Sequence, residues 1–109
     1  MIRVSLKSED DKLRLVLLGH ADYAPRGSDI VCAAASGIFY ALLGYLVNFG
    51  KEDFSVNAVR EGYADLVCGK RYGEMLKLVI LGLLQLEITY PGHIAVVEDV
   101  WNFKLLKTA

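Results

Sequence analysis

The chain has little cysteine, little proline and almost no net charge. Its 109 residues include two cysteines and two prolines, and 12 basic residues oppose 13 acidic ones, which gives a formal charge of −1. Because no basic stripe is present to attract phosphate backbones, we expect no nucleic-acid partner. Cys32 and Cys68 form no Cys-x-x-Cys pair, so we expect neither a disulfide framework nor a metal site, and a reducing, cytoplasmic location.

Apolar residues are abundant. Hydrophobic side chains make up 54% of the chain, and with glycine counted and tyrosine left out the share is roughly 58%, above the usual ~45–50%. A domain of this size has apolar surface left over once its core is built, and such surface usually meets another subunit or a membrane. We therefore expect a single domain over residues 1–109 that forms a homodimer.

Hydrophobic periodicity predicts two β-hairpins, each followed by a helix, and a last strand. The alternation from the first residues onward favours a strand over a signal peptide. The order ββαββαβ predicts an α/β fold, a two-layer sandwich with a largely antiparallel sheet and two helices on one face. The expected elements span residues 2–6, 13–17, 29–47, 54–59, 63–68, 72–90 and 94–97.

The segment Ile30 to Val47 is apolar enough to raise the question of a membrane span, because only Ser36 within it is clearly polar. The adjacent Asp29 and the amphipathic strands on both sides favour a central helix buried on nearly all sides instead. We therefore expect no membrane partner. The aromatic tail from Val100 onward is expected to pack on something.

Cys32 and His20 are the candidate reactive pair. If Ser28 or Asp29 caps the helix, Cys32 lies in its first turn, where the positive end of the helix dipole favours a thiolate. His20 lies at the start of the glycine-containing loop 19–28 that leads into this helix, so it is placed to take the thiol proton. A buried cysteine and a solvated loop histidine are the alternative interpretation. Cys68 and His93 have no such partners and are expected to be structural.

These residues resemble the signature of a known family. Gly19-His20-Ala21, Gly27 and the run from Asp29 to Ser36 are similar to the bacterial ribosomal-processing cysteine proteases, the Prp family, and Glu61-Gly62-Tyr63 is similar to its central hairpin turn. The resemblance implies a homodimeric cysteine endopeptidase without a cofactor. It also implies that the substrate is a precursor of the twenty-seventh protein of the large ribosomal subunit, whose N-terminal extension is removed after paired aromatic residues.

By the same resemblance Cys32 is the nucleophile and His20 the general base, and Asp29, Ser36 and Gly19 are supporting residues. Asp29 has two open roles, to cap the helix or to orient His20, and Ser36 lies on the same helix face as Cys32. The loop is expected to act as a lid, and amides at the helix start are expected to bind the oxyanion. An apolar pocket for aromatic side chains is expected from Tyr23, Tyr40 or Tyr45.

Two other functions remain open at this point. One is a non-catalytic dimeric interaction module in which Cys32 and His20 only pack, and the other is a small membrane-associated protein. The sequence also leaves open whether the substrate is a host ribosomal protein or another protein, such as a phage structural protein.

Overall fold

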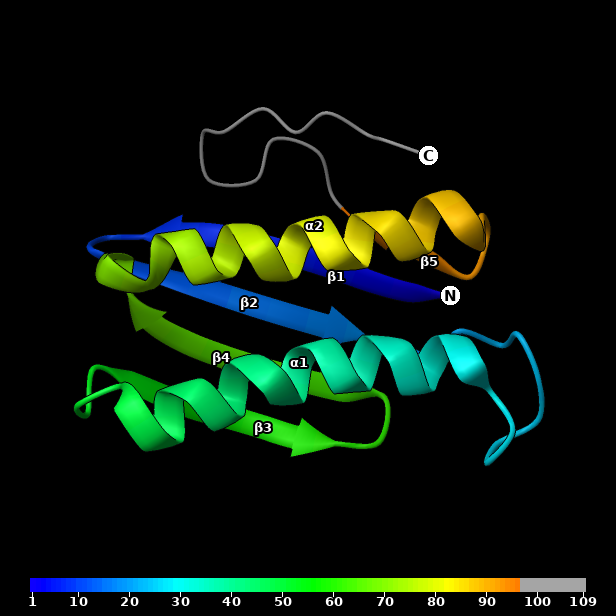
Figure 1. Ribbon diagram of the computed structural model, residues 1–109, viewed down its shortest axis with the longest axis horizontal. Coiled ribbons are helices and arrows are strands. Elements are labelled where there is room, and N and C mark those ends of the chain that lie inside the picture. The colour runs from blue at the N-terminus through cyan, green and yellow to red at the C-terminus, as the bar shows by residue number, and fades with distance from the viewer. Residues whose placement is uncertain (97–109) are drawn as a thin grey trace.

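The computed structural model describes residues 1–96, which form one five-stranded sheet and two long helices (Figure 1). The expected order of strands and helices is confirmed, and a single 3-10 turn before the second helix is the only addition among these residues. The elements are β1 (Ile2–Glu9), β2 (Lys12–Leu18), α1 (Ile30–Phe49), β3 (Phe54–Arg60), β4 (Tyr63–Gly69), η1 (Lys70–Tyr72), α2 (Gly73–Thr89) and β5 (Ile94–Val96).

The sheet has the strand order β3-β4-β2-β1-β5. The three pairs formed by β1, β2, β4 and β3 are antiparallel, whereas β5 pairs with β1 in parallel, with Ile2 opposite Ile94. The sheet is therefore largely antiparallel, as expected. Val97, the last residue of the expected final strand, and the tail from Val100 lie outside the described residues.

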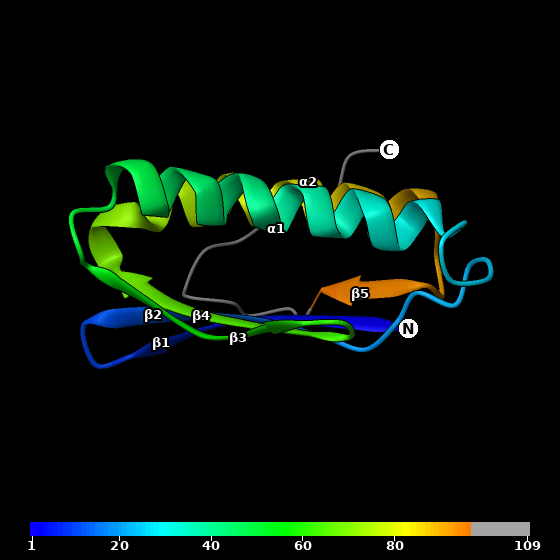
Figure 2. The ribbon, with the colours of Figure 1, turned by 90° about the horizontal axis from the view of Figure 1, so that it is seen from below.

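Both helices cover the same face of the sheet, as Figure 2 shows from the side. Alternate residues of the strands point toward them, because successive side chains of a strand lie on opposite faces. Together these strand and helix residues form one continuous core. Its fully buried members include Val4, Leu6, Leu13, Leu15, Val31, Phe39, Leu46, Leu66, Leu76, Ile80, Leu83 and Ile94.

Helix α1 differs from the expectation that it is buried on nearly all sides. Only the stripe Val31, Ala35, Phe39, Leu42 and Leu46 is buried, at the spacing of one helix face. Much of the remaining helix surface is exposed although it is largely apolar, and includes Ile30, Tyr40, Tyr45, Val47 and Phe49. Among residues 1–96, α1 is the one helix that is long and apolar enough to cross a membrane. The expectation of nearly complete burial was wrong, because the apolar composition of a helix does not show which of its sides the rest of the chain covers.

The outer face of the sheet carries one buried charge. Asp65 on β4 is only 2% exposed. Its carboxylate accepts two hydrogen bonds from the Arg14 guanidinium at 2.9 and 2.6 Å, one from the Tyr63 hydroxyl at 2.8 Å and one from the Asn57 amide at 3.3 Å. The Arg14 hydrogen bonds are the main cause that lowers the pKa of Asp65 to about 2, against the opposing effect of burial. This network joins β2, β3 and β4 across the sheet.

We predict that Asp65→Asn lowers the free energy of unfolding by about 1–2 kcal/mol at pH 7, because the substitution removes the ionised carboxyl that the folded state stabilises. The folded pKa lies below the unfolded one, so the contribution is complete above about pH 4 and disappears as the pH falls toward 2. Urea denaturation of both proteins at pH 7, 4, 3 and 2 measures this difference. A difference that stays constant down to pH 2 would contradict the assignment.

Candidate active site

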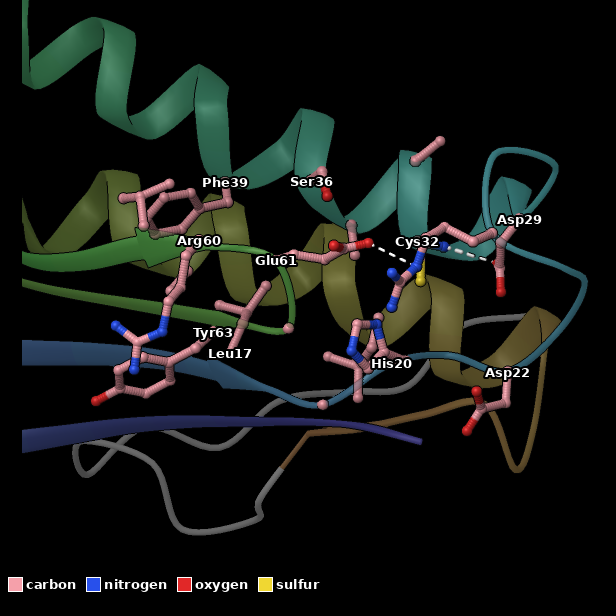
Figure 3. Close-up of a pocket in the computed structure, with 18 of the residues that line it drawn as sticks. Leu17, His20, Asp22, Asp29, Cys32, Ser36, Phe39, Arg60, Glu61 and Tyr63 are labelled. Carbon is pink, nitrogen blue, oxygen red and sulfur yellow. Dashed lines mark hydrogen bonds and ion pairs between the residues drawn. The ribbon is translucent and has the colours of Figure 1, made fainter.

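The five predicted site residues all line one cavity. It has a volume of about 660 Å³ and lies between the start of α1, the loop that follows β2, and the β3–β4 turn (Figure 3). Such a volume is typical of sites that bind ligands. The cavity residues among the five are Gly19, His20, Asp29, Cys32 and Ser36.

Cys32 lies in the first turn of α1 and is partly buried. Its Sγ accepts a hydrogen bond from the backbone N–H of Ala21, with a nitrogen–sulfur distance of 3.3 Å. Among residues 1–96 this is the only hydrogen bond to the sulfur. The sulfur therefore faces the cavity beside the loop that carries His20.

His20 is exposed, and its ring lies next to Cys32 in the cavity (Figure 3). The ring packs against the backbone of Gly62, where a β-carbon would lie 2.8 Å from the His20 Nε2. Gly62 also has a φ of +77°, so the β3–β4 turn needs glycine for two reasons. His20 and Cys32 line the same cavity, and no hydrogen bond joins the two side chains within residues 1–96. Catalytic hydrogen bonds often form only when substrate is bound.

Gly19 fixes the point from which His20 projects. Its φ is +105°, and a β-carbon there would lie 2.6 Å from the carbonyl oxygen of Met1. The Gly19 N–H donates to the carbonyl of Gly62 at 2.8 Å. The end of β2 is thus tied to the same turn that supports the His20 ring, in an arrangement that only glycine accommodates.

Asp29 caps helix α1 and also holds the preceding loop. Its Oδ1 accepts the N–H groups of Val31 and Cys32, both at 3.0 Å, and its Oδ2 accepts those of Tyr23 and Ala24 at 2.9 and 3.2 Å. These hydrogen bonds, that of Cys32 first, lower the pKa of Asp29 below its ordinary value. Of its two open roles the geometry supports capping, because no hydrogen bond links Asp29 to His20 within residues 1–96.

The Asp29 cap has a consequence for the oxyanion. The N–H groups of Val31 and Cys32, which were expected to bind it, already donate to the carboxylate, and the N–H of Ala33 donates to the Asp29 carbonyl. These three amides are therefore not free in this structure. Ser36 lines the cavity one helical turn beyond Cys32, and in the described structure it makes no hydrogen bond to the sulfur.

The aromatic lining of the cavity was only partly predicted. Tyr40 lines it, but Tyr45 packs against Phe49 on the outside of α1, with ring centroids 5.2 Å apart. Tyr23 also turns away from the cavity and packs against Tyr90 at 5.2 Å. Further apolar walls come from Ile2, Leu17, Phe39 and Val59.

An ion pair that the sequence did not suggest crosses the rim of the cavity. The Arg26 Nε of the loop lies 2.7 Å from Oε1 of Glu61 in the β3–β4 turn. Both side chains are exposed, at 74% and 58%. Figure 3 shows Glu61 reaching from its turn toward the loop. The pair is separated by 35 positions in the chain, and no local motif marks it.

The other cysteine and histidine, Cys68 and His93, were both expected to be structural. Cys68 is fully buried, as expected for a structural residue, and burial raises the pKa of its thiol to about 11. His93 was expected to have no catalytic partner and to be structural, and its Nδ1 lies 2.8 Å from the backbone carbonyl oxygen of Ala21. Among residues 1–96, no group of three or more His, Cys, Asp or Glu side chains is arranged to hold a metal ion.

Comparison with known proteins identifies the family. The family model described as cysteine protease Prp matches residues 1–95. The chain belongs to the Prp family of cysteine proteases. The ribosomal processing cysteine protease Prp of Mycoplasma pneumoniae is 34% identical over 89 residues, which cover 75% of this chain and 83% of that protein.

Solved Prp structures share the fold. The ribosomal processing protease Prp from S. aureus in complex with a covalently linked product peptide has a TM-score of 0.76 at 24% identity, covering 88% of this chain and 97% of that one. The same S. aureus protease with a substrate peptide has a TM-score of 0.72 at 23% identity, covering 89% and 98%. Membership of the Prp family makes the chain an enzyme and disfavours the non-catalytic module.

We predict that iodoacetamide modifies Cys32 much faster than Cys68 at neutral pH. The Cys32 sulfur faces the cavity, whereas Cys68 is buried and its thiol pKa is raised to about 11, so little thiolate forms there. Peptide mass spectrometry after timed labelling measures both rates in one protein. Cys68→Ser, which should leave the labelling of Cys32 unchanged, is the control, and equal rates at both cysteines would contradict the prediction.

Proposed function

We propose that this Prp family member removes the N-terminal extension of a ribosomal protein precursor, the twenty-seventh protein of the large subunit, by a Cys32/His20 dyad. The observation that carries the proposal is the meeting of Cys32 and His20, 12 positions apart in the chain, in one cavity with apolar walls. A thiol and an imidazole at opposite ends of one loop are the groups that cysteine proteases use as nucleophile and base.

The reaction follows from these two groups. His20 takes the proton of Cys32, and the thiolate attacks the scissile carbonyl carbon to form a carbon–sulfur bond. The protonated His20 then gives its proton to the leaving amine as the carbon–nitrogen bond breaks, which leaves a thioester on Cys32. Water, deprotonated by His20, hydrolyses the thioester, releases the carboxylate product and regenerates the thiol.

The cavity walls support a preference for aromatic side chains before the cut. Leu17 of β2 and Phe39 and Tyr40 of α1 give the cavity lining apolar and aromatic side chains. Aromatic substrate side chains gain both area burial and ring-edge contacts in such surroundings. The ion pair Arg26–Glu61 joins two residues that line the same cavity.

We predict that a peptide with two adjacent aromatic residues followed by a small residue is cut after the second aromatic, as mass spectrometry of the products would show. Cys32→Ala should abolish cleavage and retain peptide binding, because it removes the nucleophile and leaves the walls. Cys32→Ser should be nearly inactive, because a serine hydroxyl is a much weaker nucleophile. His20→Ala should lower kcat by about 10²–10⁴-fold.

Cys68→Ser is the matched control for these variants and should cleave like the parent, because Cys68 is buried in the core away from the cavity. Cleavage by Cys32→Ala would refute the dyad. A parent protein that leaves both the peptides and the extended ribosomal precursor intact would refute the substrate.

We also propose that the enzyme acts in the cytoplasm as a homodimer. The exposed apolar residues of α1, together with Leu78 and Leu81 on α2, form surface of the kind that a second subunit covers.

The homodimer predicts twice the chain mass, 12.0 kDa per copy, in light scattering at micromolar concentration without detergent. Tyr45→Lys on the exposed face of α1 should shift the mass toward the monomer, because it places a charge in apolar surroundings. Lys7→Glu, at an exposed position of β1 outside the two helices, serves as a charge-change control. A monomeric parent would contradict the proposal.

A further inference from the structure

The backbone of Ala21 is held on both sides. Its N–H donates to the Cys32 Sγ at 3.3 Å, and its carbonyl oxygen lies 2.8 Å from Nδ1 of His93. Ala21 itself is only 1% exposed, so water does not compete for these groups. A single buried residue therefore connects the reactive sulfur to a histidine 61 positions further along the chain.

The chemistry of this contact fixes which atom donates. A carbonyl oxygen only accepts hydrogen bonds, so Nδ1 of His93 carries the proton and donates to Ala21. The contact is 2.8 Å long, which is the length of a good hydrogen bond. His93 therefore acts on Ala21 as a fixed donor.

His93 is well placed to serve as an anchor because its own position is restrained. Its backbone N–H donates to the carbonyl of Tyr90 at 3.2 Å, and its carbonyl accepts the N–H of Ile2 at 3.0 Å. Its ring meets the Tyr23 ring edge to face, with centroids 5.2 Å apart and an interplanar angle of 82°. The anchor thus connects the end of α2, strand β1 and the loop.

The N–H of Ala21 is the donor that remains for charge at the sulfur. The amides of Val31 and Cys32 donate to Asp29, so they do not reach the reacting atoms. We propose that His93 is a positioning residue of this protease, which holds the Ala21 peptide so that its N–H faces the nucleophile. The proposal rests on the role of Cys32 given under Proposed function.

The expected effect follows from the strength and direction of the contact. An N–H group aimed at an anionic sulfur stabilises it, and hydrogen bonds to charged groups are the stronger ones. Without the His93 donor, the Ala21 peptide is free to turn, and small displacements of a group beside the reacting atoms have large effects on rate. Binding of the substrate side chains depends on the cavity walls and should change little.

The test compares three substitutions at His93. His93→Phe keeps a flat ring against Tyr23 but has no donor, His93→Asn places an amide nitrogen where Nδ1 lies, and His93→Gln places it one bond further out. We expect His93→Phe to lower kcat for peptide cleavage about tenfold with KM unchanged, and to slow iodoacetamide labelling of Cys32. His93→Asn should restore both rates to near the parent value, and His93→Gln should not.

The labelling experiment needs no substrate, so it tests the role of His93 even if the peptides of the proposed function are not cut. His93→Phe that cleaves and labels like the parent would overturn the proposal. So would equal activity of His93→Asn and His93→Gln, because the position of the donor would then not matter. Thermal melting of each variant identifies any that do not fold, and the Asn and Gln pair decides the outcome if the Phe variant is one of them.

Discussion

The arrangement of the site depends on the carboxylate of Asp29. Its four accepted hydrogen bonds join the first turn of α1 to residues 23 and 24 of the loop. One oxygen holds the helix that carries Cys32, and the other holds the loop that carries His20. Asp29 therefore helps to place the Cys32 and His20 side chains in one cavity, although no hydrogen bond links it to either side chain. A short side chain with two acceptor oxygens is needed here, and an amide in its place would lose two of the four bonds.

Most of the fold was predictable from local signals. The alternation of apolar residues, the turn at Gly62 and the stop at Pro91-Gly92 located every strand and helix within a few residues of its observed bounds. The position of β5 beside β1, in parallel, was not predictable, because that pairing joins residues about 90 positions apart. The exposure of α1 was missed for a similar reason, since a helix of uniformly apolar composition carries no periodic signal that separates its inner from its outer face.

The site was predictable to the extent that its residues share a short segment. Gly19, His20, Asp29, Cys32 and Ser36 lie within 18 positions, and their order along a loop and a helix start was enough to bring them to one cavity. Glu61, Gly62 and His93 approach the same place from distant parts of the chain. The turn glycine could be recognised as a turn but not as the support of the His20 ring. His93 follows an ordinary helix end, and its contact with Ala21 exists only because β5 closes the edge of the sheet.

The ion pair between Arg26 and Glu61 at the cavity is weak, so little free energy is needed to break it. Both partners are mostly in water, where such pairs contribute at most about 1 kcal/mol. For a contribution of about 1 kcal/mol or less, this pair alone is broken in roughly 15% or more of the molecules at any moment. Breaking the pair therefore takes up little of the free energy that a ligand gains by entering the cavity.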